Sequence, residues 1–342
     1  MDPFFSTFWK PLALSTDWMD VKPVSMEEGD DPVVCIEYGE SAGEVMSYLY
    51  AMTNRGGESS DRALELSRKA VLCNLSGYTA WAFRRMILEG SAADNQDRDF
   101  SEGVLESMPK NYQLWNHRRR LAECLVDAGA EDLDYDFDFA KRALEGDAKN
   151  YHAWAHRQAL LVGKDGAMLE KEREYAETLV DLDVHNNSAW TQKAFVLEKS
   201  LEDVKDVTDA CESLFADREL PYVSEKIKLA PHNGASWSYL YGLMTNEKLS
   251  QAFWKKSNDV FGLVFGVLKD WPSCPAAMDF LGQMYGRLAD MHARRENWSK
   301  ARKAGSNAIE TWGKLQVVDP IRAGYYRHMI HLMSARLQSW PE

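Results

Sequence analysis

The sequence lacks most of the features that mark a membrane protein or a self-sufficient enzyme. It has no Gly-rich phosphate loop, no G-x-S-x-G, no H-E-x-x-H and no cluster of His, Cys and Asp at metal-ligand spacing. No apolar run reaches the roughly 18 residues that span a bilayer, and the N-terminus lacks the basic and apolar regions of a signal peptide. We therefore expect no transmembrane segment and no signal peptide, and a chain that is either a scaffold or one part of an enzyme.

Cysteine and positive charge are also scarce. The 5 cysteines are scattered among 342 residues and form no C-x-x-C pair, which favours reduced thiols, a cytoplasmic location and no zinc site within this chain. Asp and Glu number 53 against 40 Lys and Arg, so the formal net charge is −13. Because this charge repels phosphates, we expect no nucleic-acid partner.

Tryptophan, in contrast, is abundant and recurs within one motif. Residues 149–158 read KNYHAWAHRQ and residues 110–119 read KNYQLWNHRR, and weaker copies surround this pair. The motif tryptophans stand 34 to 47 residues apart and are Trp81, Trp115, Trp154, Trp190 and Trp237. Self-similarity at such a period is typical of a repeat array, and the helical patterns around it predict an all-α solenoid of paired helices.

Residues 1–40 differ from the rest of the chain. Four prolines and the acidic run at 27–31 argue against a helix and predict an extended N-terminal arm. Within the arm, residues 32–36 fit either a strand or a segment that lies across another surface. The apolar residues between positions 4 and 9 indicate that the arm docks on its own solenoid or on a partner.

From 41 to 342 we predict a single helical-repeat solenoid. Its helices alternate as first and second members of pairs, and an extra turn or loop is expected near 202–220. The predicted helices cover 41–54, 59–73, 76–89, 94–107, 111–128, 133–146, 150–162, 167–182, 187–201, 225–228, 233–246, 251–269, 275–296, 298–315 and 320–337.

Each second helix has a similar beginning. An Asn is usually available as the N-cap, a Trp follows three or four residues later, and a cation usually stands three residues beyond the Trp. Tyr, Trp and Arg at this spacing form one broad helical stripe, so we expect the Trp to fill the gap between neighbouring repeats. We expect Arg84, Arg118 and Arg157 to reach carboxylates or helix-end carbonyls of the adjoining pair.

Two lysines occupy positions that suit an anion. Lys110 and Lys149 each directly precede a capped helix start, where free N–H groups and the helix dipole favour a ligand such as a diphosphate. The alternative interpretation is that both are solvated loop lysines. The first residues of the same helices lie on the same edge and either frame a ligand or hydrogen-bond between repeats: Tyr112, Gln113, Tyr151 and His152.

These motifs also match a known family. The sequence resembles the α-subunit shared by protein farnesyltransferase and geranylgeranyltransferase type I. The resemblance is most specific at 109–119 and 147–158 and extends to 186–190 and 231–237, and residues 17–24 and 32–38 are similar to the N-terminal arm of that family.

The resemblance implies a crescent-shaped α-α superhelix wrapped around a separate β-subunit. Such an enzyme transfers a farnesyl or geranylgeranyl group from its diphosphate to the cysteine of a C-terminal C-a-a-X motif, and the α-subunit is active only together with the β-subunit. The resemblance also implies Zn²⁺ held by the β-subunit, Mg²⁺ with farnesyl diphosphate, and no metal ligand in this chain.

Site residues follow from the resemblance as well. It implies that Lys110 contacts the isoprenoid diphosphate and that Tyr112 lies beside it, both with catalytic roles. Gln113 is expected to receive the C-terminal carboxylate of the C-a-a-X substrate. The remaining residues implied at the substrate site line the diphosphate side more peripherally: Asn150, Tyr151 and His152.

Two interpretations from other classes stay open on the residues alone. A non-enzymatic, tetratricopeptide-like scaffold that binds peptides fits the repeat spacing of 34 to 39 residues, although the Trp-Leu-Gly…Tyr pattern is absent. An RNA-processing helical repeat is also Trp-rich, but the net charge of −13 disfavours it.

Overall fold

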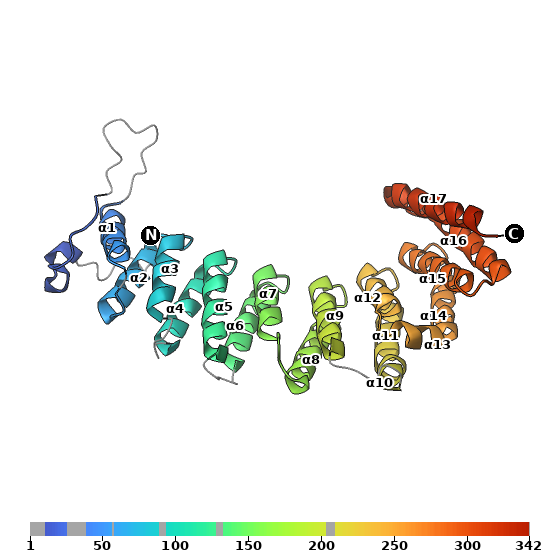
Figure 1. Ribbon diagram of the computed structural model, residues 1–342, viewed down its shortest axis with the longest axis horizontal. Coiled ribbons are helices and arrows are strands. Elements are labelled where there is room, and N and C mark those ends of the chain that lie inside the picture. The colour runs from blue at the N-terminus through green and yellow to red at the C-terminus, as the bar shows by residue number, and fades with distance from the viewer. Residues whose placement is uncertain are drawn as a thin grey trace, which may run out of the picture. The chain divides into compact units, whose positions relative to one another are not determined.

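The computed structural model describes residues 11–25, 39–56, 58–88, 94–127, 133–202 and 209–341. Helices joined by short turns make up this part of the chain, and no strand occurs in it (Figure 1). The chain divides into two compact units, Met1–Lys164 and Asp165–Glu342, each of which has its own packing. The all-α prediction is confirmed, whereas a single solenoid over 41–342 stays a prediction.

The described part of the N-terminal arm is not simply extended. It contains two short 3-10 helices, η1 (Leu12–Leu14) and η2 (Thr16–Trp18), in which Trp18 packs edge-on against Tyr48 with ring centroids 5.5 Å apart. Three apolar side chains of this part are buried: Leu12, Trp18 and Val21. This part therefore docks on the chain's own first helices, while the predicted segment 32–36 and residues 4–9 lie outside the described residues.

The first unit continues as first and second helices in alternation. Its helices are α1 (Glu40–Asn54), α2 (Asp61–Cys73), α3 (Tyr78–Leu88), α4 (Asp94–Ser107), α5 (Tyr112–Asp127), α6 (Asp134–Gly146) and α7 (Tyr151–Leu160). The second helix of each pair, α3, α5 or α7, begins with the motif tyrosine. These bounds agree with the predicted helices to within a few residues.

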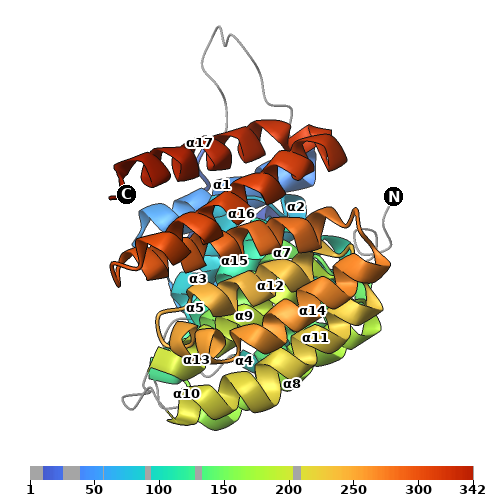
Figure 2. The same cartoon turned by 90° about the vertical axis from the view of Figure 1, so that its right-hand side faces the viewer.

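The helices of the second unit vary more in length. They are α8 (Gly166–Leu182), α9 (Asn187–Glu202), α10 (Asp209–Ser213), η3 (Leu214–Glu219, a π-helical turn), α11 (Leu220–Leu229), α12 (Gly234–Thr245), α13 (Ser250–Lys255), α14 (Ser257–Asp270), α15 (Pro275–Ala293), α16 (Trp298–Val318), η4 (Pro320–Arg322) and α17 (Ala323–Ser339). Figure 2 shows α15, α16 and α17 as neighbouring helices at the end of this unit. Gly282 permits their close packing, because a Cβ there would lie 2.5 Å from Nε1 of Trp312.

Two predicted boundaries in the second unit are wrong. The turn or loop expected near 202–220 is helical from Asp209 onward, since the π-helical turn accommodates Pro221, which has no N–H for an α-helical bond. The predicted helix 251–269 is two helices, because the backbone leaves helical geometry at Lys256 (φ −98°, ψ 14°). The stretch 209–219 contains many charged residues, and its apolar residues do not recur at helical spacing, so the sequence did not predict a helix there.

The turn from each first helix to its second helix has one length. Six such turns contain four residues each: 74–77, 108–111, 147–150, 183–186, 230–233 and 271–274. In every one of them the N–H of the last residue donates to the carbonyl of the first at 2.9–3.0 Å. The turns therefore present the starts of the second helices in one repeated conformation.

One carbonyl in these turns accepts two side-chain hydrogen bonds. The carbonyl of Pro109 accepts from Nε1 of Trp115 at 2.9 Å and from Nδ2 of Asn150, in the next repeat, also at 2.9 Å. The same double acceptor recurs at Leu75, Val184 and Pro231. The Trp thus ties each helix to its own turn, and the Asn ties that turn to the following repeat.

At Pro231 the second donor is Sγ of Cys274, at 3.2 Å. Cys274 occupies the N-cap position of α15, where α5, α7, α9 and α12 have Asn. A thiol is a weaker donor than an amide but fits the same place. Cys274 therefore marks a further repeat copy that the sequence motif no longer shows.

The motif cations are buried between carboxylates of the first helices. Arg84 donates through Nε to Asp97 at 2.8 Å, and Arg118 contacts both Asp97 (3.3 Å) and Asp136 (3.0 Å). Nε2 of His117 lies 3.0 Å from both oxygens of Asp97. Burial alone would raise the pKa of Asp97, but the adjoining cations outweigh it and hold the pKa below its usual range.

The expected partners are confirmed for Arg84 and Arg118, whereas Arg157 contacts a carbonyl within α6, the first helix of its own pair. Arg84 and Arg118 bind carboxylates, and Nη1 of Arg157 donates to the carbonyl of Phe137 at 2.8 Å. Lys193, which replaces Arg in the fourth copy, is 1% exposed and contacts Glu177 (2.7 Å) and Glu219 (2.9 Å). A compact ammonium thus compensates for the lost bidentate geometry with two carboxylates.

Candidate ligand-binding edge at the starts of α5 and α7

The candidate site lies where two neighbouring turns meet in the first unit. Asn150 caps α7, and its Oδ1 accepts from the backbone N–H groups of His152 (3.0 Å) and Ala153 (3.3 Å). Its Nδ2 donates to the carbonyl of Pro109 in the turn before α5. Asn150 is fully buried, and its one side chain fixes the start of α7 against the residue that precedes Lys110.

Lys110 projects from this junction as an accessible cation. Its side chain is 69% exposed, and its Nζ lies 2.8 Å from Oδ2 of Asp147, the first residue of the next turn. Oδ1 of Asp147 accepts from the backbone N–H of Lys149 at 3.0 Å. The hydrogen bond from Lys110 is the main reason that the pKa of Asp147 lies below its usual value, so the carboxylate stays charged and holds the ammonium in place.

Aromatic rings contact one another at the starts of α5 and α7. The ring of Tyr112 meets that of His152 edge-on at 4.3 Å, and Tyr151 meets His152 in the same manner at 5.6 Å. The His152 ring is also stacked parallel to Trp115 at 6.5 Å. Burial, followed by the charges of Arg119 and Lys110, lowers the pKa of His152, so its ring is neutral at pH 7.

The tyrosines and the tryptophans of the predicted helical stripe differ in burial. Tyr112 and Tyr151 are 72% and 73% exposed, whereas Trp115 is 2% exposed. Within the stripe, the Trp therefore fills the gap between repeats, as expected, and the Tyr does not. As the first residue of its helix, each tyrosine extends along the edge instead of into the inter-repeat gap.

Gln113 is buried beside this edge. It is 5% exposed, and its Oε1 has no hydrogen-bond partner among the residues that the structure describes. A buried polar atom without a hydrogen-bond partner lowers the stability of the fold. This favours a hydrogen-bond partner for Gln113 that comes from another molecule. Because the O and N positions of an amide are assigned rather than observed, this end of the side chain is able either to accept or to donate.

The structure brings the predicted site residues together. Lys110 and Gln113 flank the start of α5, and the Tyr112 ring at that start contacts His152 of α7, which Tyr151 also touches. Asn150 uses both ends of its amide within the chain, so a contact of Asn150 with a substrate stays a prediction. Sequence reasoning missed Asp147, although an Asp at the first position of a turn was a usable signal.

The chemistry of this edge is that of anion binding. It offers an exposed ammonium, a tyrosine hydroxyl, a neutral imidazole and the start of a helix, all of which suit phosphate oxygens. In the described part of the chain, no group of three or more His, Cys, Asp or Glu side chains is arranged to hold a metal. None of the described helices combines the length and apolarity needed to cross a bilayer.

Known proteins share this architecture. Four-residue turns, capping asparagines and paired helices define a helical-repeat protein, and a model of the family "Protein prenyltransferase alpha subunit repeat" matches residues 94–125, 133–162 and 169–200. The solved structure of Candida albicans protein geranylgeranyltransferase-I complexed with GGPP is similar, with a TM-score of 0.67 and 24% identity, covering 92% of this chain and 97% of that chain. This likeness confirms the predicted fold class.

Curated relatives define the family more narrowly. The chain is 34% identical over 326 residues to the protein farnesyltransferase/geranylgeranyltransferase type-1 subunit alpha of Pisum sativum, covering 92% of this chain and 93% of that protein. The corresponding subunit of Arabidopsis thaliana is 37% identical over 329 residues, covering 92% and 94%. The chain therefore belongs to the family of protein farnesyltransferase/geranylgeranyltransferase type-1 alpha subunits. The prediction of a prenyltransferase alpha subunit is confirmed, and the tetratricopeptide-like scaffold is not favoured.

Proposed function

We propose that this chain acts with a separate β-subunit to move a farnesyl or geranylgeranyl group from its diphosphate to the cysteine of a C-terminal C-a-a-X motif. The names of the type-1 alpha-subunit relatives support this, as does the GGPP with which the similar Candida albicans protein is complexed. The observation in this chain that carries the proposal is Lys110, an exposed ammonium that Asp147 of the neighbouring repeat holds at the start of α5.

Lys110 is proposed to stabilise the leaving group. In this reaction the substrate sulfur bonds to the first isoprenoid carbon while the bond from that carbon to a diphosphate oxygen breaks, so negative charge grows on that oxygen. A fixed ammonium beside it lowers the barrier because it is already oriented when the charge develops. Lysine has three N–H donors, and it keeps Asp147 on one while it offers the others to the diphosphate.

Tyr112 and His152 are proposed to complete the diphosphate side. The edge-on contact of their rings holds the Tyr112 phenol against His152, and we propose that its hydroxyl donates to a phosphate oxygen. A neutral His152 ring keeps one N–H donor and adds no charge that would compete with Lys110. Tyr151 borders the same side through its contact with His152.

Gln113 is proposed to receive the terminal carboxylate of the peptide. Its unpartnered amide end, assigned as the acceptor Oε1, becomes a neutral donor when the amide is flipped so that Nε2 takes that place. A carboxylate anchored there selects a cysteine at a fixed separation from the chain end, which is the requirement of a C-a-a-X substrate.

Metal ions enter this proposal only through the partner and the substrate. The described residues of this chain offer no group of three potential ligands, so they do not fit Zn²⁺, which the family resemblance assigns to the β-subunit, or Mg²⁺ with farnesyl diphosphate. A cytoplasmic location is also proposed, supported by the free thiols of Cys73, Cys124, Cys211 and Cys274.

Replacement of Lys110 by alanine tests the proposal. In the heterodimer we expect Lys110→Ala to lower kcat by about 100- to 1,000-fold, the loss typical of one preorganised donor to a developing negative charge. Because Lys110 is exposed, assembly with the β-subunit should be unchanged. The control is Lys141→Ala, which removes an exposed lysine of α6 and should leave turnover unchanged. Normal turnover of Lys110→Ala in an intact heterodimer would contradict the assigned role.

A further inference from the structure

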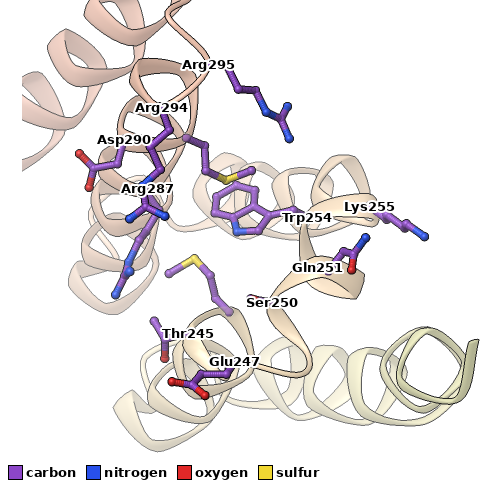
Figure 3. A pocket seen from close by; sticks show the side chains of 12 residues that line it. Thr245, Glu247, Ser250, Gln251, Trp254, Lys255, Arg287, Asp290, Arg294 and Arg295 are labelled. Carbon is purple, nitrogen blue, oxygen red and sulfur yellow. The ribbon is translucent and has the colours of Figure 1, made fainter. Parts of the chain in front are cut away.

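A second concave site lies in the second unit, at the opposite ends of the second helices. A cavity of about 640 Å³ opens between the end of α12, helix α13 and the end of α15 (Figure 3). The Lys110 edge is built from helix starts, whereas this cavity is built from the helix ends Met244–Thr245 and Met291–Arg295. None of its lining residues belongs to the site described above.

Unpaired positive charge lines this cavity. Arg287, Arg294 and Arg295 face it, and no ion pair joins any of them to a carboxylate within the described ranges of the chain. In Figure 3, Arg287 and Arg294 lie to the left of the Trp254 indole, Arg295 lies above it and Glu247 lies below it. The lining thus has three guanidinium groups and the ammonium of Lys255 against the two carboxylates of Glu247 and Asp290, in a protein whose formal net charge is −13.

The other charges at this cavity are already engaged. Asp290 accepts two hydrogen bonds from Nη1 of Arg336 on α17, at 2.8 and 3.1 Å. Lys255 is paired with Glu212 of α10. Neither pair neutralises the three arginines, so the cavity keeps a net positive charge.

A tight turn fixes two of the arginines. Arg294 ends α15 by donating its N–H to the carbonyl of Asp290 at 3.0 Å, and the N–H of Asn297 returns to the carbonyl of His292 at 2.9 Å. Glu296 within this turn has φ +56°, a left-handed conformation that residues with a side chain seldom adopt. Because the chain reverses direction here, α15 ends and Arg294 and Arg295 lie at the rim of the cavity.

The cavity also has an apolar wall. Trp254 is half-buried, with its indole edge-on to Phe253 at 5.3 Å, and Met244 and Met291 line the same space. Methionine side chains adapt their shape to an apolar guest, and an indole face accepts an aliphatic or aromatic side chain. An inorganic anion alone would make no use of this wall.

We propose that this cavity binds a short acidic peptide segment of another protein, with one apolar side chain against Trp254 and flanking carboxylates on Arg287, Arg294 and Arg295. Arginine pairs with carboxylates through two parallel N–H bonds, so three arginines around an apolar wall define both the charge and the register of such a segment. The volume of the cavity suits a few side chains. The proposal does not depend on the transferase activity.

Fluorescence anisotropy with the full-length chain tests this proposal. The probe is a labelled peptide with one phenylalanine flanked by two glutamates on each side. We expect saturable binding that weakens at least about tenfold in Arg294→Gln/Arg295→Gln, the effect of lost charge-assisted hydrogen bonds. Both arginines are exposed, so the fold should be retained. The control is Arg327→Gln on α17, an exposed arginine outside the cavity, which should bind like the unaltered chain.

Two altered probes identify the source of binding. Replacing the glutamates by glutamines should abolish binding, and replacing the phenylalanine by alanine should weaken it about tenfold because the apolar contact is lost. The proposal is overturned if the unaltered probe does not bind, or if Arg327→Gln weakens binding as much as the double variant. It is also overturned if the alanine probe binds equally well, since the site would then take any anion.

Discussion

Asn150 offers the sharpest test of how the fold positions the candidate site. Its amide caps α7 through Oδ1 and holds the neighbouring turn through Nδ2, which donates to the carbonyl of Pro109, the residue before Lys110. Asn150→Ala removes both functions, whereas Asn150→Asp keeps the capping acceptor and loses only the donor. Asn233 is a matched control, because it caps α12 and donates to the carbonyl of Val184 in the second unit.

The magnitude follows from these bonds. Loss of an N-cap costs about 1 kcal/mol, and loss of a buried hydrogen bond costs about 1 kcal/mol more, so each Asn→Ala change should lower the free energy of unfolding by about 2 kcal/mol. For a unit of this size, that corresponds to a fall of roughly 4–8 °C in Tm. Asn150→Asp should lose about half as much, because only the bond to Pro109 disappears.

Activity should separate the two asparagines. In the heterodimer we expect Asn150→Ala and Asn150→Asp to lower kcat about 10- to 100-fold, since a small displacement of Lys110 misaligns it with the leaving group. Asn233→Ala should cost the same stability with little change in kcat. Equal kcat for Asn150→Ala and Asn233→Ala would refute the positioning role. A KM for the isoprenoid diphosphate that rises more in Asn150→Asp than in Asn150→Ala would indicate direct substrate contact instead.

Two further predictions concern the buried ion network of the first unit. Arg118→Leu should lower the free energy of unfolding by about 3–5 kcal/mol in urea titrations, because it leaves Asp97 and Asp136 buried without their shared cation, whereas the exposed Arg120→Leu should cost little. Burial lowers the pKa of His117 and His156, so the unfolded chain binds their protons first as the pH falls below about 6.5. The free energy of unfolding from urea titrations should therefore fall between pH 7 and 5, by up to about 1.4 kcal/mol per pH unit for each histidine. A flat profile would contradict this.

Local signals made much of the fold predictable. A capping Asn, a Trp four residues later and an apolar helical period all lie within one helix, so the starts of α5 and α7 follow from the sequence. The type of partner that the motif arginines contact was also predictable, because a buried guanidinium requires a hydrogen-bond acceptor. At Cys274 the sequence motif is no longer recognisable. The repeat is still present in the structure, because the Cys274 thiol donates to the Pro231 carbonyl, and no local sequence pattern predicts that hydrogen bond.

The site was only partly predictable, because its contacts join different repeats. Lys110 and Asp147 are 37 positions apart in the sequence, and their ion pair depends on the stacking of two turns. The exposure of Tyr112 likewise depends on where a helix begins relative to the inter-repeat gap, which a periodicity does not specify. The charged stretch 209–219 has the composition of a loop, and its helix depends on a few buried residues such as Phe215.

The constant turns also determine where this chain can change in length. In five repeats the motif Trp stands six residues after the carbonyl to which it donates. An inserted residue in a four-residue turn would disrupt the hydrogen bond that closes the turn and displace the carbonyl to which Trp and Asn donate. The described connections at the other ends of the second helices vary in length: 161–165 has five residues, and 246–249 and 294–297 have four. These connections are therefore the places where insertions and deletions are best accommodated. New binding surfaces can therefore arise there, beside the arginine-lined cavity, while the lysine edge keeps its spacing.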